Sequence, residues 1–320
     1  MLLKDKVAGK LYIIGEYNVL KSGHSALVAP VNLYMSGTLK KDENLFVVTD
    51  NDKVVDLIND KTPRNLRYTA TTIQLFHDYL ATIGVKQQNF KITIKNNLKA
   101  DGKIKYGLGS SGASIVLIVR LLNKFYKTNF DNLTILKFSI LVQKHLNKYS
   151  SGGDLAASVY NAPVLYTRYD LNWLEQERFS FALLKNEWPL LNVKIIKNVP
   201  KFAVGWTKET FKPVIDGDIN SDFFSNAEKL VHEFVTSFNP EIITKYQALL
   251  NELEKERPGL MTEKLKTLIA TSHALGLSAK ISGAGFGDSG IALIKTRKDK
   301  RKLREVWAKN DIMLLDIWRT

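Results

Sequence analysis

The feature that most constrains this chain is a glycine- and serine-rich segment at residues 106–114 (YGLGSSGAS), between a predicted strand and an apolar helix. Glycine lets the backbone approach an anion closely, and a helix start offers free N–H groups and the positive end of a dipole. The segment therefore favours phosphate binding, although a tight turn with a serine cap explains it equally well when it is taken alone. It lacks the lysine that follows the last glycine in a Walker loop.

The first half of the chain combines strand patterns with helix patterns. Alternating, β-branched and aromatic residues predict the strands, and apolar residues three and four apart predict the helices. The expected elements are strands at residues 7–14, 27–39, 45–48 and 90–94, helices at 69–83, 113–126 and 133–147, and a short strand at 164–169. This order, with strands first and helices later, predicts an α+β fold.

The regular pattern lapses in the polar stretch 178–191, where we expect a domain boundary. Beyond it we expect strands at residues 193–196, 202–206, 291–294 and 312–317, helices at 222–238, 240–256, 261–275 and 299–309, and a glycine loop at 282–290. The sequence thus predicts a first domain at residues 1–190 and a second at 191–320.

Charge and composition narrow the function classes. The 320 residues carry a formal charge of +14, which favours a polyanionic partner such as a nucleic acid, an acidic membrane surface or a phosphorylated small molecule. The absence of cysteine excludes disulfides, thiolate metal sites and a cysteine nucleophile. No stretch approaches the roughly 20 apolar residues of a membrane helix, and no signal peptide is evident, so we expect a soluble, cytoplasmic protein.

Three further segments carry groups suited to phosphate chemistry. Residues 9–17 place Lys10 at the start of an apolar strand, residues 149–157 place Asp154 at the start of a short helix, and residues 280–290 hold a second glycine loop. Each has an ordinary explanation by itself: a solvated lysine, a capping carboxylate, and a connector between helix and strand. Two such glycine loops in one chain weaken that explanation for each loop.

Together and in this order, the four segments resemble the GHMP superfamily of small-molecule kinases, over essentially the whole chain. The motifs of that superfamily are a Gly-Lys strand ending in Gly-Glu, a central Gly-Leu-Gly-Ser-Ser loop and a C-terminal Ser/Thr-Gly-Ala-Gly loop. Within it, the chain is similar to the bacterial phosphomevalonate kinases, through GKLY and GEY in residues 9–17, GDLA at 153–156, VGWTK at 204–208 and GDSGIAL at 287–293.

The resemblance implies both a fold and an activity. The N-terminal domain would be like domain 2 of ribosomal protein S5 and would bind ATP, the C-terminal domain would be ferredoxin-like, and the active site would lie between them. The reaction would transfer the γ-phosphoryl group of ATP, with Mg²⁺, to (R)-5-phosphomevalonate. The products would be ADP and 5-diphosphomevalonate, in the mevalonate pathway of isoprenoid biosynthesis.

The same resemblance implies the catalytic and nucleotide-binding residues. Asp154 matches the aspartate that serves as the base in mevalonate kinases, Lys10 matches the lysine beside it, and Ser111 would face Mg²⁺. The residues expected to wrap the ATP phosphates are Lys105, Tyr106, Gly107, Leu108, Gly109, Ser110, Ser111, Gly112 and Ser114. The C-terminal loop expected to close on the phosphates and the acceptor consists of Ser282, Gly283, Ala284 and Gly285.

The acceptor's own phosphate also needs partners. Lys208 is the first candidate because its segment marks the phosphomevalonate branch, and Trp206 stands beside it, although core packing is the simpler role for that indole. The weaker candidates around the acceptor are Tyr12, Glu16, Tyr17, His24, Ser150, Ser151 and Gly152.

Two residues depart from the motifs of the superfamily. Tyr17 follows the Gly-Glu pair where other branches often have histidine, and Phe286 stands where the third motif often has glycine. Phe286 argues against a glycine-only conformation at every residue of that loop.

The chemistry of a phosphate acceptor modifies the implied mechanism. A phosphomonoester has a second pKa near 6 and is already largely an oxyanion at neutral pH, so the difficulty lies in bringing two polyanions together rather than in deprotonation. Phosphoryl transfer then needs cations and oriented N–H groups. We therefore expect Lys10 to stabilise the transferred phosphoryl group, and Asp154 to position Lys10 or the metal rather than act mainly as a base.

Two other functions remain open. A mevalonate kinase, or another GHMP kinase with a hydroxyl acceptor, fits the same motifs. Residues 295–304 hold seven basic residues, which raises the question of nucleic-acid binding, but they lie on a predicted helix without interleaved aromatic residues, so we expect a solvated face. The sequence therefore predicts no nucleic-acid or membrane partner, a monomer or homodimer, and part of the excess lysine in the cleft between the domains.

Overall fold

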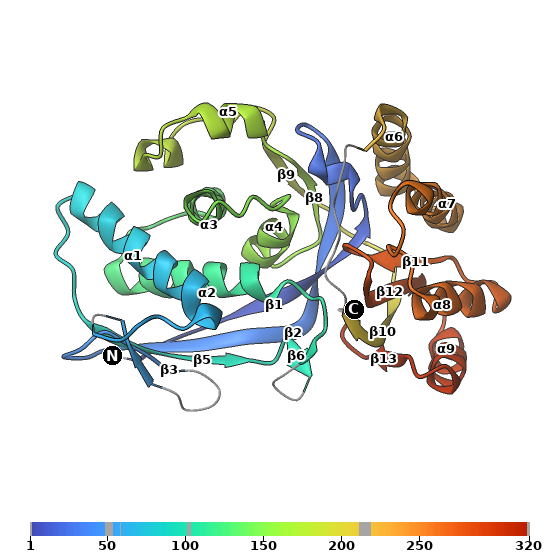
Figure 1. The fold of residues 1–320 in the computed structure, drawn as a ribbon, viewed down its shortest axis with the longest axis horizontal. Coiled ribbons are helices and arrows are strands. Elements are labelled where there is room, and N and C mark those ends of the chain that lie inside the picture. The colour runs from blue at the N-terminus through green and yellow to red at the C-terminus, as the bar shows by residue number, and fades with distance from the viewer. Residues whose placement is uncertain (1, 49–53, 58, 101–103, 211–218, 319–320) are drawn as a thin grey trace.

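The structure, a computed structural model, describes residues 2–48, 54–57, 59–100, 104–210 and 219–318 (Figure 1). It consists of a larger N-terminal unit and a smaller C-terminal unit that lie side by side (Figure 1). Both units combine a β-sheet with helices, so the predicted two-domain α+β architecture is confirmed.

The larger sheet contains seven strands, and its long strand β2 organises the rest. The order is β4-β3-β5-β2-β8-β9, with β1 on the other side of β2. The early part of β2 pairs with β8 and its later part with β5, which its 17 residues allow. The strands are β1 (Leu2–Ile14), β2 (Ser25–Lys41), β3 (Phe46–Val48), β4 (Val54–Asp56), β5 (Phe90–Asn96), β8 (Val164–Thr167) and β9 (Asn192–Ile195).

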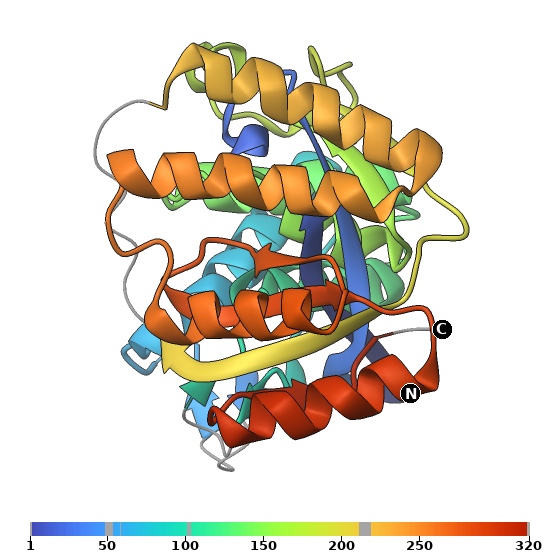
Figure 2. The same cartoon turned by 90° about the vertical axis from the view of Figure 1, so that its right-hand side faces the viewer.

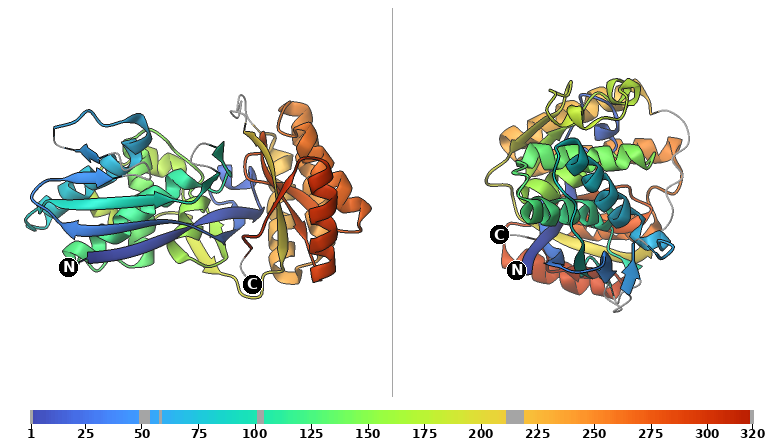
Figure 3. Two further views of the ribbon diagram at one scale, coloured as in Figure 1. Left: turned by 90° about the horizontal axis from the view of Figure 1, so that it is seen from below. Right: turned by 90° about the vertical axis from the view of Figure 1, so that its left-hand side faces the viewer.

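Helices cover one face of this sheet, as the view from below shows (Figure 3). Helix α2 lies closest to the sheet and packs on β1 and β2, because its side chains from Ile115 to Val119 are all apolar and fully buried. The helices are α1 (Arg67–Thr82), α2 (Ser110–Tyr126), α3 (Asn132–His145), α4 (Gly153–Tyr160) and α5 (Leu171–Gln176). The short strands β6 (Lys99–Ala100) and β7 (Ile104–Lys105) pair with each other in a separate two-stranded sheet before α2.

The smaller unit has a four-stranded sheet in the order β11-β12-β10-β13, with four helices stacked along its outer side (Figure 2). The strands are β10 (Phe202–Thr210), β11 (Ala279–Ser282), β12 (Gly287–Leu293) and β13 (Met313–Leu315), and the helices are α6 (Ser221–Ser237), α7 (Pro240–Glu256), α8 (Glu263–Ala274) and α9 (Arg297–Lys309). Close packing of α8 and α9 on the sheet requires Gly205, because a Cβ there would lie 2.6 Å from Leu268 Cδ1 and 3.0 Å from the Trp307 ring.

The domain boundary expected between residues 190 and 191 stays a prediction. One strand pairing crosses that position. β9 follows that boundary and nevertheless pairs with β8, so the larger sheet extends to Ile195. The polar stretch before β9 is also not featureless, since it contains the 3₁₀ turn η3 (Phe181–Leu184) and the buried side chain of Trp188. The sequence did not predict α5, because a helix of six residues carries too little periodicity.

The basic cluster at residues 295–304 forms a solvated face on and before α9. Leu303 is the buried residue of this segment, and the basic side chains around it are exposed or partly exposed. This confirms the predicted role of the cluster. None of the helices in the described part of the chain is long and apolar enough to cross a membrane.

A buried ion pair joins the two units where β1 ends. Lys280 on β11 donates to the carboxylate of Glu16, and these side chains are 0% and 2% exposed. Burial raises the pKa of Glu16 and lowers the pKa of Lys280, while each charge acts in the opposite direction on the other. Tyr246 on α7 supports the same joint, because its hydroxyl donates to the Glu16 carbonyl oxygen at 2.7 Å.

We predict that Lys280→Met destabilises the protein by about 3–5 kcal/mol, because it leaves a buried carboxylate without its cation. The unpaired Glu16 would then have a pKa raised further above its unfolded value. A raised folded-state pKa gives stability that is present at low pH and is lost as the pH rises. The deficit relative to wild type should therefore be smaller at pH 5 than at pH 8 in denaturant-unfolding measurements.

The double variant Glu16→Gln/Lys280→Met is the control, because it removes both charges and should recover much of the lost stability. A deficit in Lys280→Met that does not change with pH, or a double variant as unstable as the single one, would contradict this role of the ion pair.

Candidate active site

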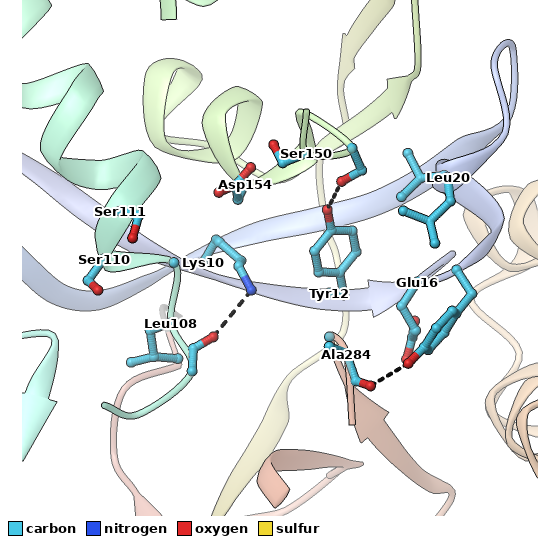
Figure 4. Close-up of a pocket in the computed structure, with 16 residues that line it drawn as sticks. Lys10, Tyr12, Glu16, Leu20, Leu108, Ser110, Ser111, Ser150, Asp154 and Ala284 are labelled. Atoms are coloured by element: carbon cyan, nitrogen blue, oxygen red, sulfur yellow. Dashed lines mark hydrogen bonds between the residues drawn. The ribbon is translucent and has the colours of Figure 1, made fainter. Parts of the chain in front are cut away.

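A cavity of about 320 Å³ opens beside the joint, where β1, the start of α2, the start of α4 and the turn between β11 and β12 converge (Figure 4). The residues that line it are Lys10, Tyr12, Glu16, Tyr17, Val19, Leu20, Gly107, Leu108, Gly109, Ser110, Ser111, Ser150, Ser151, Asp154, Gly283 and Ala284. The four sequence segments singled out for phosphate chemistry therefore meet at one place.

Lys10 lies at the centre of the cavity. A register irregularity in β1 between Ala8 and Lys10 interrupts the pairing with β2, and the Lys10 backbone N–H donates instead to Leu108 O at 3.0 Å. Its ammonium donates to Gly107 O at 3.2 Å. Burial lowers the pKa of Lys10, and the nearby carboxylates of Asp154, Asp288 and Glu16 partly restore it.

Asp154 approaches Lys10 from the first turn of α4. A Cβ on Gly109 would lie 3.0 Å from Lys10 Cε and 3.6 Å from Asp154 Cβ, so the loop and the two side chains are packed together. Burial raises the pKa of Asp154, while Lys10 and hydrogen bonds from the Leu155 backbone and Ser150 act to lower it. The Asp154 Oδ1 atom is buried and has no hydrogen-bond partner among the described residues.

The glycine loop takes the shape expected of a phosphate cradle. Gly107 and Gly109 have φ angles of 76° and 77°, and the chain enters α2 directly after Gly109, so Ser110 and Ser111 form the first turn at the cavity wall. The Asp154 carboxylate can approach the start of α2 because residue 112 is glycine: a Cβ there would lie 2.6 Å from Asp154 Oδ2. The arrangement offers free N–H groups of a helix start next to a lysine, which suits an anionic phosphate.

The acceptor side is built by hydroxyl groups and the C-terminal loop. Tyr12 OH and Ser151 Oγ are hydrogen-bonded at 2.7 Å, and Ser282 Oγ donates to Tyr12 O at 2.9 Å. Tyr17 OH donates to Ala284 O, so both ends of this loop are tied to the first domain. Phe286 has a φ of 54°, in the left-handed region that residues other than glycine also adopt, so its position does not require a glycine-only conformation.

The cavity contains groups that could bind a hard cation. Mg²⁺ prefers oxygen ligands and usually combines one or two carboxylates with substrate phosphates. The unpaired Asp154 Oδ1 and the Ser111 hydroxyl, in the first turn of α2, provide such oxygens. The described residues contain no cluster of three or more His, Asp or Glu side chains, so a cation here would depend on nucleotide oxygens.

Several residues predicted for the site do not line the cavity. Lys208 pairs with exposed Asp311 at 2.5 Å, so the structure does not support it as the acceptor's phosphate ligand. Trp206 is 4% exposed, with its ring centroid 4.8 Å from that of Tyr106, which is the packing role. His24 interacts with Asn18 instead, at 2.9 Å.

The remaining predicted residues lie behind the residues that line the cavity, or fall outside the described part of the structure. The Ser114 and Thr69 hydroxyls are hydrogen-bonded to each other at 2.9 Å, away from the cavity. Tyr106, Gly112, Gly152, Ser282 and Gly285 belong to the segments that form the wall, but they do not line it. The side chain of Lys105 is outside the described part of the structure. Among the described lining residues Lys10 is the one basic side chain, so the predicted concentration of lysine in the cleft is limited to it.

Two lining residues and one acidic neighbour were not predicted from the sequence. Val19 and Leu20 line the far end of the cavity from the 3₁₀ turn η1 (Asn18–Leu20). The carboxylate of Asp288 lies against Gly107, since a Cβ on that glycine would be 2.7 Å from Asp288 Oδ2. The second glycine loop contained a signal for Asp288, an acid next to glycines, whereas two apolar residues in a turn carry no signal of their own.

A glycine loop at a helix start, a buried lysine beside an acid and an adjoining second domain define a phosphoryl-transfer enzyme for small molecules. Comparisons with known proteins identify the family. The family described as GHMP kinases N terminal domain matches residues 67–162, and GHMP kinases C terminal matches residues 239–312. The chain belongs to the GHMP kinases.

Individual relatives align over nearly the whole chain. The phosphomevalonate kinase of Streptomyces sp. (strain CL190) is 27% identical, covering 97% of this chain and 95% of its own. The structure of Streptococcus pneumoniae phosphomevalonate kinase in complex with phosphomevalonate and AMPPNP is 31% identical, with a TM-score of 0.89, and covers 99% of this chain and 100% of that one. The mevalonate kinase of Methanocaldococcus jannaschii is 24% identical over 96% of each chain.

We predict that Gly112→Ala lowers kcat about 100-fold, because the added methyl group displaces the Asp154 carboxylate and a displacement of about 1 Å at a reacting centre costs on that order. Helix stability should not suffer, since alanine favours helices. Gly84→Ala is the control for substitution away from the cavity: a Cβ there meets no heavy atom within 4 Å, and its φ of 68° should cost some stability but leave kcat near wild type. Equal rates in both variants would show that the close approach of Asp154 is unnecessary.

We also predict that kcat/KM falls on the alkaline side with a midpoint below 10.5, because burial lowers the pKa of Lys10 in the free enzyme. The rate should fall as the pH rises, since the protonated ammonium is the active form. Lys10→Arg keeps its charge throughout this range and should lack that decline, whatever its absolute rate. The same alkaline midpoint in both proteins would assign the titration to another group.

Proposed function

We propose that this protein is a phosphomevalonate kinase, which transfers the γ-phosphoryl group of ATP to (R)-5-phosphomevalonate and forms 5-diphosphomevalonate and ADP. The observation that carries the proposal is the position of Lys10, between the start of α2 on one side and the Tyr12 and Ser151 hydroxyls on the other. The two phosphomevalonate kinases described above support the choice of acceptor.

The nucleotide would place its phosphates on the loop from Gly107 to Ser111. The left-handed backbone at Gly107 and Gly109 lets that loop approach phosphate oxygens, and the free N–H groups of the first turn of α2 would donate to them. Ser111 would contribute its hydroxyl to Mg²⁺ together with Asp154 Oδ1. When bound, Mg²⁺ supplies charge neutralisation of the nucleotide oxygens.

The acceptor phosphate would enter from the side of Tyr12 and Ser151. It needs no general base, because its second pKa near 6 leaves it an oxyanion at neutral pH. Lys10 would attract that oxyanion and the transferring phosphoryl group together, and would stabilise the charge shared between them. The residues Ser282–Ala284 would hold the acceptor side closed, through their hydrogen bonds to β1 and Tyr17.

Asp154 would act mainly on Lys10 and the metal. Its carboxylate favours the charged form of Lys10, whose pKa burial would otherwise lower further. Its buried Oδ1 is available for a cation. A carboxylate in this position would hold the ammonium oriented and protonated, which is what an anionic acceptor requires.

The second candidate function is that of a mevalonate kinase. The similarity to the mevalonate kinase of Methanocaldococcus jannaschii supports this alternative. A hydroxyl acceptor would make direct use of Asp154 as a base, since that acceptor must lose a proton. A cytoplasmic location and action as a monomer or homodimer remain predictions from the sequence.

The test is an assay that couples ADP release to a spectrophotometric signal, with phosphomevalonate and mevalonate measured side by side. We expect turnover with phosphomevalonate and a kcat/KM at least 100-fold lower with mevalonate. The matched control is the same protein with each acceptor omitted, which measures ATP hydrolysis alone. Turnover with mevalonate alone would reject the proposed acceptor and leave the family assignment intact.

A further inference from the structure

The turn η1 forms the end of the cavity that lies farthest from the phosphate loop. Val19 and Leu20 line the cavity from this turn. In the close-up, Leu20 lies on the opposite side of Lys10 and Tyr12 from Ser110 and Ser111 (Figure 4). If the nucleotide phosphates occupy the serine end, this turn contacts the acceptor.

A carboxylate from the second domain holds this turn in place. Glu228 on α6 accepts from Asn18 Nδ2 at 2.6 Å and from the Ser25 backbone N–H at 2.8 Å, both with Oε2. Asn18 is 0% exposed, and it also donates to Ser25 O at 2.8 Å and interacts with His24 at 2.9 Å. One side chain of α6 therefore fixes both ends of the segment that contains η1.

The other contacts of Glu228 keep it charged and oriented. His232, one turn further along α6, lies 2.8 Å from Oε1, and His24 lies 3.7 Å from Oε2. Burial raises the pKa of Glu228, but the hydrogen bonds from Ser25, Asn18 and His232 outweigh it and hold the pKa below its ordinary value. From within the first domain, Arg168 donates to Leu20 O and so holds the end of the same turn.

We propose that Glu228 is a positioning residue for the acceptor, and that it acts from the second domain through Asn18 and Ser25 on the turn that forms the acceptor end of the cavity. The proposal rests on the proposed function for the identity of the acceptor. Through Glu228, the binding of the acceptor depends on how α6 packs on the first domain. The binding of ATP does not.

The first test is steady-state kinetics of Glu228→Ala and Glu228→Gln with both substrates varied. Glu228→Ala should raise the KM for phosphomevalonate about tenfold, since hydrogen bonds to a charged group contribute on that order, and should change the KM for ATP less than twofold. Glu228→Gln keeps an acceptor oxygen for Asn18 and Ser25 and should recover most of the affinity. Glu233→Ala, five residues further along α6 and with its carboxylate 3.9 Å from Lys229, is the matched control and should resemble wild type.

The second test is hydrogen–deuterium exchange, which needs no acceptor. Glu228→Ala should speed exchange of the amides in residues 18–25 relative to wild type and to Glu233→Ala. Unchanged exchange there, or equal increases in both KM values, would overturn the positioning role. A wild-type protein without turnover of phosphomevalonate would reject the proposed function instead, and the exchange result would still decide whether Glu228 holds the turn.

Discussion

The joint between the two domains depends on a buried ion pair. Glu16 follows the strand that carries Lys10, and Lys280 lies on the strand β11 that leads into the second glycine loop. A charge buried without a partner is strongly disfavoured, so each member of this pair requires the other domain to be in place. The pair therefore aligns Lys10 in the first domain with Gly283 and Ala284 in the second, and the cavity exists only where both are present.

The cavity places one cation where two anions must meet. Lys10 contacts the phosphate loop through Gly107 O and faces the acceptor side at Tyr12, whose ring centroid lies 5.1 Å from its ammonium. Burial disfavours the charged form of Lys10 and lowers its pKa, and the Asp154 carboxylate partly offsets this effect. This balance suits a group whose task is to stabilise charge that arrives with the substrates, rather than to donate a proton. The side chains of Ser111 and Ser151 line the same cavity.

Much of this organisation was predictable from local sequence signals. The helix Pro240–Glu256 agrees with its predicted range, and the 106–114 loop precedes α2 as expected, because periodicity and glycine punctuation act over a few residues. The exclusion of Lys208 from the cavity was not predictable, since it depends on Asp311, which is 103 positions away. The same holds for Glu228, whose contacts with Asn18 and Ser25 arise only when the two domains meet. Local patterns therefore located the segments, while pairings between distant segments determined which side chains reach the cavity.

The central claim is that Lys10 stabilises the transferred phosphoryl group and that Asp154 positions it without acting as the base. The most direct test is the pH dependence of kcat for wild type and Asp154→Asn with phosphomevalonate, measured above the second pKa of the acceptor. The account predicts a large fall in kcat for the asparagine variant with no change on the acid side of the pH profile, while the alkaline decline moves to lower pH because Lys10 loses a carboxylate that favours its charged form. An acid limb in the wild-type profile that disappears in Asp154→Asn would show a titrating base and would contradict the account.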